Sequence, residues 1–155
     1  MVKTPVLVIH GPNLNLLGTR EPAIYGTLSL EQINTCILEL GNELDLELKI
    51  IQSNHEGEII DAIHSAQGVY EWIVMNPGAF THYSYGIRDA IAGAAVPTIE
   101  VHLSNLHNRE EFRKNSVTAS VCVGQISGFG YVSYLLALQA IKGQRKAHKG
   151  DGYVG

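Results

Sequence analysis

The sequence predicts an α/β protein whose parallel sheet is covered by helices on both faces. Two observations lead to this prediction. Short β-rich runs alternate with amphipathic helical patterns along the chain, which is typical of strands joined by right-handed helical crossovers. The first run, residues 6–9, is apolar at every position, as expected of a strand that is buried on both sides.

Five strands are predicted, and a helix follows each of them. The strands are placed at residues 6–9, 48–51, 72–75, 97–101 and 121–123. The chain is expected to turn at residues 124–130 before its last helix. This number of elements favours a doubly wound, flavodoxin-like sandwich with three α/β/α layers.

The clearest helix is predicted over residues 29–45. Its apolar residues recur every three or four positions, and Ser29 with Gln32 fits a capping box. The other helices are placed at residues 56–66, around 87–94, near 109–114 and at 131–142. We expect residues 1–155 to form a single domain in which residues 143–155 are a flexible tail.

The composition of the chain limits which partners it can bind and in which compartment it is expected. The 155 residues are 45% hydrophobic, enough for a real core, and the net charge of −4 argues against nucleic acid as a partner. No apolar stretch reaches the roughly 18 residues of a membrane span, and no signal-peptide core is present, so a cytoplasmic protein is expected. Cys36 and Cys122 are predicted to be two buried free thiols.

Residues 11–26, after the first strand, read as a long ordered loop because Gly and Pro interrupt any regular apolar pattern. Loops of this length are uncommon in compact domains and often act as active-site lids, although a plain surface loop is the alternative. Arg20 and Tyr25 lie five positions apart in it. A turn at Glu21 and Pro22 would bring this cation and this phenol together.

Polar residues follow the predicted strands. In open parallel sheets, ligands bind beyond the carboxyl ends of the strands, near the point where the strand order reverses. The residues that fall there are Asn13, Ser53, Asn54, Asn76, residues 100–105 and Gly124. This pattern locates a site without identifying a reaction.

Signatures of common cofactors are missing. The sequence has no Walker-type phosphate loop, and the glycines at 124, 128 and 130 do not follow the first strand as a dinucleotide fingerprint would. His102 and His107 lie five residues apart with no cysteine nearby, which makes a metal site a poor reading. We therefore expect neither a cofactor nor a metal.

With cofactors and metals set aside, acid–base catalysis by ionisable side chains is the chemistry that the sequence suggests. Glu100 and His102 alternate along one strand, so both side chains lie on the same side, and a carboxylate beside a histidine makes it a credible proton donor. Tyr25 would be the opposing base. A phenol titrates near pH 10, so this role needs a shift of about three units, roughly 4 kcal/mol, from nearby positive charge. Arg20 is the nearest source in sequence, and Arg109 or Arg113 could add to it.

Six motifs, covering about residues 5–142, resemble the type II 3-dehydroquinate dehydratases. They are residues 11–15, the Arg20 to Gly26 segment, residues 52–57, residues 76–82, residues 87–90 and residues 100–113. The resemblance implies a flavodoxin-like fold, no cofactor, and anti elimination of water from 3-dehydroquinate through an enolate. It also implies a homo-oligomer, a dodecamer built from trimers.

The same resemblance implies a role for each matching residue. Tyr25 takes the C2 proton, Arg20 holds the tyrosinate, and His102 protonates the departing C1 hydroxyl. Glu100 orients the histidine, and Asn13 positions a water at the enolate oxygen. The substrate-binding residues would be Asn76, His82, Leu103, Ser104, Arg113 and, across a trimer interface, Asp89.

Several alternatives stay open. Asp89 could form a surface ion pair with Arg88, and His82 could cap the third helix. Tyr83 and Gln125 depart from the family pattern, which bears on local packing more than on chemistry. The reaction could serve quinate breakdown instead of aromatic biosynthesis, and the fold could belong to a phosphate-binding or flavin-binding enzyme or to a ligand-binding protein without catalysis.

Overall fold

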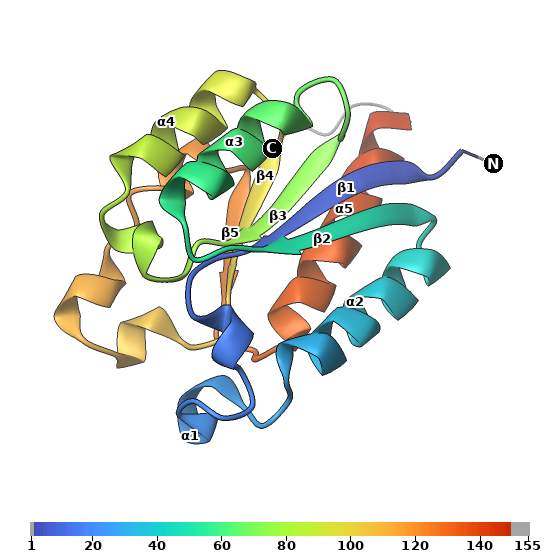
Figure 1. The fold of residues 1–155 in the computed structure, drawn as a ribbon. Coiled ribbons are helices and arrows are strands. Elements are labelled where there is room, and N and C mark those ends of the chain that lie inside the picture. Colours follow the sequence, from blue (N-terminus) through green and yellow to red (C-terminus); the bar gives the residue numbers. More distant parts are fainter. Residues whose placement is uncertain (1, 150–155) are drawn as a thin grey trace.

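A single parallel sheet is the frame on which the other elements are arranged. In the computed structural model, which describes residues 2–149, its strands lie in the order β2-β1-β3-β4-β5 (Figure 1). They span Thr4–His10 (β1), Leu46–Gln52 (β2), Trp72–Asn76 (β3), Thr98–His102 (β4) and Gly124–Ser127 (β5), and every neighbouring pair is parallel. The chain reverses direction across the sheet after β2. This order confirms the doubly wound, flavodoxin-like prediction.

Helices cover both faces of the sheet, which gives the three predicted layers (Figure 1). The α-helices span Pro22–Tyr25 (α1), Leu30–Glu43 (α2), Glu56–Ala66 (α3), Tyr85–Ala94 (α4) and Val132–Lys149 (α5). The 3-10 helices are η1 Leu14–Leu16, η2 Gly78–His82, η3 Leu106–Asn108, η4 Glu111–Lys114 and η5 Ala119–Val121.

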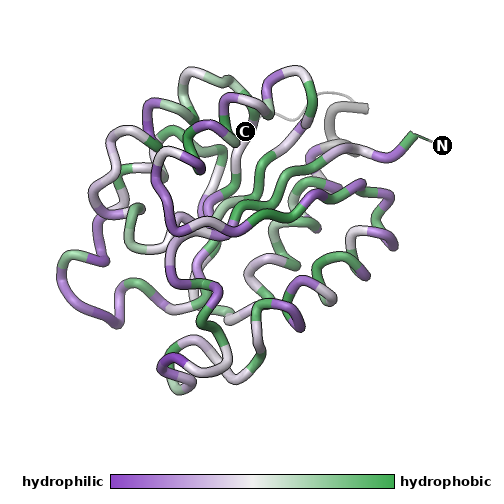
Figure 2. Tube along the Cα trace, viewed as in Figure 1, coloured by the Kyte–Doolittle hydropathy of each residue, from purple (hydrophilic) through white to green (hydrophobic). Residues whose placement is uncertain are grey.

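The core has two halves because alternate side chains of each strand point to opposite faces. Val6 and Val8 of β1 pack with α2 and α5, whereas Leu7 and Ile9 pack with α3 and α4. The central strands are accordingly hydrophobic along their length in Figure 2, and the helices are hydrophobic mainly where they face them. Burial of each of these aliphatic side chains stabilises the folded state by about 1.5–3 kcal/mol relative to leaving it exposed.

The start of α2 follows the predicted capping box. Ser29 accepts a hydrogen bond from the backbone N–H of Gln32 at 3.2 Å, and the Gln32 side chain accepts one from the backbone N–H of Ser29 at 2.9 Å. These two bonds satisfy two N–H groups that the first turn of a helix leaves without partners. The helix therefore begins where the sequence predicted.

The prediction was wrong for the segment between β4 and β5. Residues 121–123 do not form the fifth strand, which lies at Gly124–Ser127, where a turn was expected. The predicted helix near residues 109–114 is a single 3-10 turn, η4, and a second 3-10 turn, η3, precedes it. Cys122 therefore follows a 3-10 turn and not a strand, and both cysteines are half-buried and unbridged.

The last helix is longer than predicted. It continues to Lys149, past residue 142, so residues 143–149 are helical. The remainder of the expected tail, residues 150–155, lies outside the described residues. Among the helices of the described chain, none combines the length and the apolarity needed to cross a membrane.

The loops that follow β1 and β3 approach each other closely. The backbone N–H of Gly11 donates to the carbonyl of Asn76 at 2.7 Å, and a Cβ at Gly11 would lie 2.6 Å from the carbonyl carbon of Pro77. A side chain at this position would collide with backbone atoms, which cannot swing aside. Only glycine permits this contact at the point where the strand order reverses.

Candidate active site

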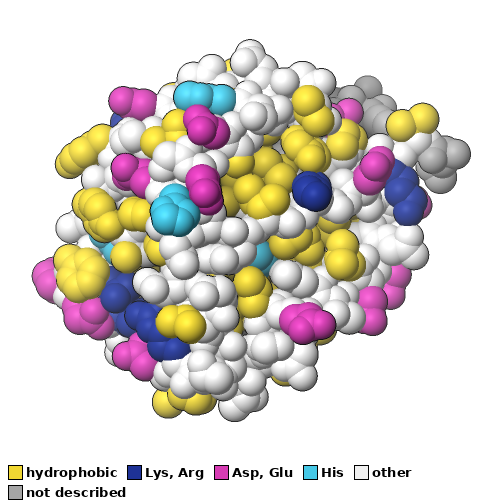
Figure 3. Space-filling model, in the orientation of Figure 1, with side chains coloured by type: hydrophobic (Ala, Val, Ile, Leu, Met, Phe, Trp, Pro, Cys, Tyr) yellow, Lys and Arg dark blue, Asp and Glu magenta, His cyan; other side chains and the backbone are white. Residues whose placement is uncertain are grey.

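The loops after β1, β3 and β4 enclose a small cavity of about 50 Å³ at the carboxyl end of the sheet. The cavity brings together all of the predicted site residues except Glu100 and Asp89. They are Asn13, Arg20, Tyr25, Asn76, His82, His102, Leu103, Ser104 and Arg113, joined by Arg109. Lys and Arg side chains gather on the face shown in Figure 3, over the segment that holds η3 and η4.

Tyr25 sits at the end of the short helix α1. Glu21 precedes this helix with a φ of 42°, and Pro22 starts it, so the chain turns where the sequence predicted. The turn places the Arg20 guanidinium carbon 5.2 Å from the centre of the Tyr25 ring. This cation therefore lies over the face of the phenol.

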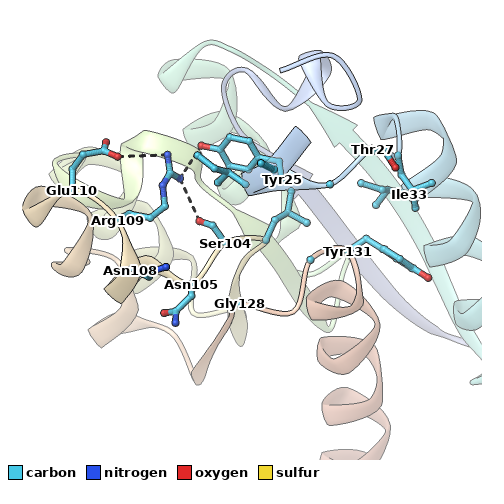
Figure 4. Close-up of a pocket in the computed structure, with 16 residues that line it drawn as sticks. Tyr25, Thr27, Ile33, Ser104, Asn105, Asn108, Arg109, Glu110, Gly128 and Tyr131 are labelled. Atoms are coloured by element: carbon cyan, nitrogen blue, oxygen red, sulfur yellow. Dashed lines mark hydrogen bonds and ion pairs between the residues drawn. The ribbon is translucent and has the colours of Figure 1, made fainter. Parts of the chain in front are cut away.

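A second arginine contacts the phenol oxygen itself. Arg109 donates from Nη1 to the Tyr25 hydroxyl at 2.8 Å and to the Ser104 hydroxyl at 3.3 Å (Figure 4). The carboxylate of Glu110 lies 3.8 Å from its other terminal nitrogen. Arg109 is thus the cation best placed to stabilise a negative oxygen on Tyr25. The sequence offered it only as one of two supplementary cations.

His102, which lines the cavity, is paired with Glu100. Nε2 of His102 lies 3.0 Å from a carboxylate oxygen of Glu100, and both side chains are buried at the end of β4. Nδ1 is therefore the ring nitrogen available to a ligand, since no other hydrogen bond to this imidazole occurs among the described residues. The predicted pairing of the two side chains is present.

Three further side chains surround the Glu100 carboxylate. Ser116, Thr118 and Gln125 all donate hydrogen bonds to it. Burial alone would raise the pKa of Glu100, but the hydrogen bond and charge of His102, with the bonds from Thr118 and Gln125, hold that pKa below its usual value. The carboxylate therefore stays ionised beside the imidazole.

Sequence reasoning missed these three donors. Gln125 was noted only as a departure that concerned packing, yet it donates directly to Glu100. Its register was misjudged because residues 124–130 were expected to be a turn, whereas Gln125 pairs with Glu100 across β5 and β4. A correct placement of the fifth strand would have revealed the contact.

His82 and Arg113 line the cavity from η2 and η4. Nδ1 of His82 lies 2.7 Å from the carbonyl oxygen of Asn115. Burial lowers the pKa of His82, and the nearby charges of His102 and Arg113 lower it further, against the opposing effect of the Asn115 carbonyl. Arg113 donates from Nε to Glu110 at 2.8 Å, so an incoming carboxylate would share this guanidinium with a partly exposed partner.

Asn76 and Asn13 also line the cavity, and each is held by hydrogen bonds. The side-chain oxygen of Asn76 accepts from the backbone N–H of Gly78 at 3.0 Å, and its nitrogen donates to Tyr134 at 3.2 Å. Asn13 has a left-handed backbone, with a φ of 68°, and its N–H donates to the Asn54 side chain at 2.9 Å. The loops after β1 and β2 are thereby joined.

Asp89 does not line the small cavity. It is exposed on α4, and Arg88, its expected ion-pair partner, bonds instead to the Val117 carbonyl and the Ser120 hydroxyl. No ion pair of Asp89 occurs within the described residues. Its role at a neighbouring subunit stays a prediction.

A larger, open cavity of about 590 Å³ adjoins the small one. Tyr25, Leu103, Ser104 and Arg109 line both cavities. Figure 4 shows the larger cavity, with Tyr25 and Arg109 among the residues that line it. The described part of the chain holds no group of three or more His, Cys, Asp or Glu side chains arranged to bind a metal ion.

Fold and site together define a flavodoxin-like α/β protein with a cavity of ionisable and polar side chains at the carboxyl edge of its sheet. Comparison with known proteins gives the family. A sequence model described as Dehydroquinase class II matches residues 4–142. The chain belongs to this class II dehydroquinase family.

Two relatives and two solved structures illustrate the similarity. The chain is 57% identical to a 3-dehydroquinate dehydratase of Bacillus cytotoxicus, over 88% of this chain and 93% of the relative. It is 59% identical to one of Halothermothrix orenii, over 88% and 92%. The type II dehydroquinase structures from Butyrivibrio crossotus and Propionibacterium acnes superpose with TM-scores of 0.88, at 49% and 39% identity, covering 90% and 92% of this chain and 97% and 98% of theirs.

Proposed function

We propose that this protein dehydrates 3-dehydroquinate to 3-dehydroshikimate. The observation that carries the proposal is that Tyr25, contacted by Arg109, and His102, contacted by Glu100, line the same small cavity in a chain of the class II dehydroquinase family. A separate base and acid in one cavity suit an anti elimination, which removes a proton and a hydroxyl from opposite faces of the substrate.

The reaction divides into two steps on this chain's residues. Tyr25, as phenolate, takes a proton from C2 of the substrate, and the electron pair moves toward the carbonyl oxygen to give an enolate. Arg109 and Arg20 stabilise the phenolate before this transfer. Asn13 lines the cavity and would hold a water that donates a hydrogen bond to the enolate oxygen.

In the second step, the enolate collapses to a C1–C2 double bond and the C1 hydroxyl leaves. His102 donates a proton from Nδ1, so the leaving group is water. Glu100 fixes the ring by its contact with Nε2 and stabilises the imidazolium. The phenol returns its proton to solvent, and the imidazole is protonated again, so neither a cofactor nor a metal is required.

The remaining polar groups of the cavity would hold the substrate. Arg113 suits the carboxylate because its planar fork can bind two oxygens at once. Asn76, His82, Leu103 and Ser104 would hold the hydroxyls and help to hold the carboxylate, Leu103 and Ser104 through backbone as well as side-chain atoms. Asp89 would approach from a neighbouring subunit of a trimer, four of which form a dodecamer.

The decisive experiment is to add 3-dehydroquinate and follow the conjugated enone of the product in the near ultraviolet. Tyr25→Phe should lower the rate of product formation to about 1% of wild type or less, because it removes the hydroxyl that acts as the base and keeps the aromatic ring. Tyr70→Phe, at a half-buried tyrosine that lines neither cavity, is the matched control. An inactive wild type, or an active Tyr25→Phe protein, would contradict the proposal.

We further propose that residues 1–155 are a single catalytic domain that works in the cytoplasm, in the shikimate pathway toward aromatic amino acids. Quinate breakdown is the alternative and needs the same elimination. Loss of the gene should produce a requirement for aromatic amino acids in the biosynthetic case, and a failure to grow on quinate in the other.

A further inference from the structure

A chain of buried hydrogen bonds runs behind the active site, from α2 to the end of β3. Asn34 Oδ1 lies 2.8 Å from Nε2 of His10, Nδ1 of His10 lies 2.9 Å from the Tyr134 hydroxyl, and Tyr134 accepts from Asn76 at 3.2 Å. His10, Tyr134 and Asn76 are 0%, 1% and 4% exposed. Neither the sequence motifs nor the proposed reaction steps use His10 or Tyr134.

The direction of every bond in this chain follows from one backbone amide. The N–H of Gly78 can only donate, so the Asn76 atom that faces it at 3.0 Å is the oxygen. The Asn76 nitrogen must then face Tyr134, and the Tyr134 oxygen accepts. The hydroxyl hydrogen of Tyr134 is then free to donate to Nδ1 of His10. Nδ1 accepts this hydrogen bond, so it carries no hydrogen of its own.

The histidine is therefore neutral and carries its proton on Nε2, where Asn34 Oδ1 accepts it. Burial lowers the pKa of His10 to about 4, which agrees with a neutral ring at physiological pH. The ring of His10 also packs edge-on against Tyr134, with 5.0 Å between their centres. Both the position and the hydrogen of the Tyr134 hydroxyl are thus fixed.

This arrangement leaves one part of the Asn76 amide free. An amide nitrogen has two hydrogens, and Tyr134 accepts only one of them. Asn76 lines the small cavity, so the second N–H is the group that can reach a ligand there. If the amide turned over, its nitrogen would face the Gly78 N–H and that contact would fail, and its oxygen would be paired only if the Tyr134 hydroxyl gave up its hydrogen bond to Nδ1 of His10.

We propose that Tyr134 and His10 are positioning residues, which hold the Asn76 amide with an N–H directed at a hydroxyl of the substrate. This inference rests on the proposed function, because it assigns Asn76 to substrate binding. A ligand with an acceptor oxygen at that point is bound without the cost of orienting the amide. The effect belongs to substrate recognition and not to proton transfer.

A double-mutant cycle tests the inference. Tyr134→Phe should lower kcat/KM for 3-dehydroquinate by about 10-fold, mostly through KM, because one oriented hydrogen bond is lost. In an Asn76→Ala protein, the same Tyr134→Phe change should alter kcat/KM by less than about 2-fold. Equal losses in the two backgrounds, or no loss in the wild-type background, would overturn the proposal.

Asn34→Ala gives a second route if Tyr134→Phe does not fold, because Asn34 is half-buried on α2. It removes the acceptor that keeps the His10 proton on Nε2, and kcat/KM should fall by about 3-fold, again only when Asn76 is present. Asn42→Ala, on the exposed side of the same helix, is its control. Wild-type inactivity toward 3-dehydroquinate would refute the proposed function, whereas an active wild type with a purely additive cycle would refute only this inference.

Discussion

Arg109 donates a 2.8 Å hydrogen bond to the Tyr25 hydroxyl across 84 positions of sequence. Arg20, only five positions away from Tyr25, lies over the ring with 5.2 Å between its guanidinium carbon and the ring centre. A cation that touches the oxygen gains directly when the phenol loses its proton, because the new charge develops on that atom. The two arginines therefore act on the same phenol in different ways.

Removal of Arg109 should lower kcat as strongly as removal of a hydrogen-bond donor that stabilises charge in a transition state. We expect Arg109→Ala to lower kcat by about 100-fold or more, and Arg20→Ala to do so by at least about 100-fold, with the fold intact. Lys114→Ala removes an exposed cation of the neighbouring η4 turn and should leave the rate unchanged. A steady-state assay of the three variants would refute the assignment if Arg109→Ala retained near-normal turnover.

Gln125 should matter through Glu100. Gln125→Leu removes a donor from the Glu100 carboxylate, so the pKa of Glu100 should rise toward its usual value. The stability that this carboxylate contributes is present above about pH 4.5 and is lost as the pH falls through its lowered pKa. The variant should therefore be less stable than wild type above about pH 4.5, and this difference should shrink as the pH falls, because the variant has less of this stability to lose.

Urea unfolding at several pH values would measure this change. Gln67→Leu replaces an exposed glutamine that follows α3 and serves as the control. Identical acid profiles for Gln125→Leu and wild type would show that the hydrogen bond to Glu100 is without electrostatic consequence.

His10 should make the protein sensitive to mild acid. Its pKa is lowered from 6.5 to about 4 by burial, so between these values the unfolded chain binds a proton that the folded chain does not. Stability should be complete above pH 6.5 and should fall by roughly 2 kcal/mol by about pH 4.5. His10→Asn should flatten this part of the profile, whereas His64→Asn, at an exposed position of α3, should keep it.

Two glycines should respond to alanine in opposite directions. Gly11→Ala places a methyl group 2.6–2.7 Å from backbone atoms of Asn76 and Pro77 and should destabilise the fold by about 1–3 kcal/mol. Gly143→Ala, in open space within α5, should stabilise it by up to about 1 kcal/mol. Thermal unfolding of the two variants decides the matter, and a harmless Gly11→Ala would contradict the close approach of the loops.

The parts of the fold that the sequence predicts are those governed by local periodicity. The α2 helix carries both its apolar repeat and its capping box within a few residues, and the central strands are continuous apolar runs. The β5 strand carries no such signal because it lies at the edge of the sheet, where its first residues are exposed. Residues 121–123 are more apolar and took its place in the prediction.

The site likewise has contacts that follow from local sequence and contacts that depend on the folded sheet. Glu100 and His102 are predictable because strand alternation alone puts them on one side. The contacts of Arg109 with Tyr25 and of Gln125 with Glu100 join segments that only the folded sheet brings together. The roles of the predicted residues came from the family motifs and await the experiments above.

The small size of the cavity has a kinetic consequence. At about 50 Å³ it is well below the roughly 300 Å³ of a typical small-molecule pocket, so we expect the segment that carries α1 to move outward when a six-membered ring enters. Association should then be slower than diffusion, with the rate of ligand capture saturating at high concentration. Stopped-flow measurements would give the rate at this plateau, which equals the rate at which the segment opens.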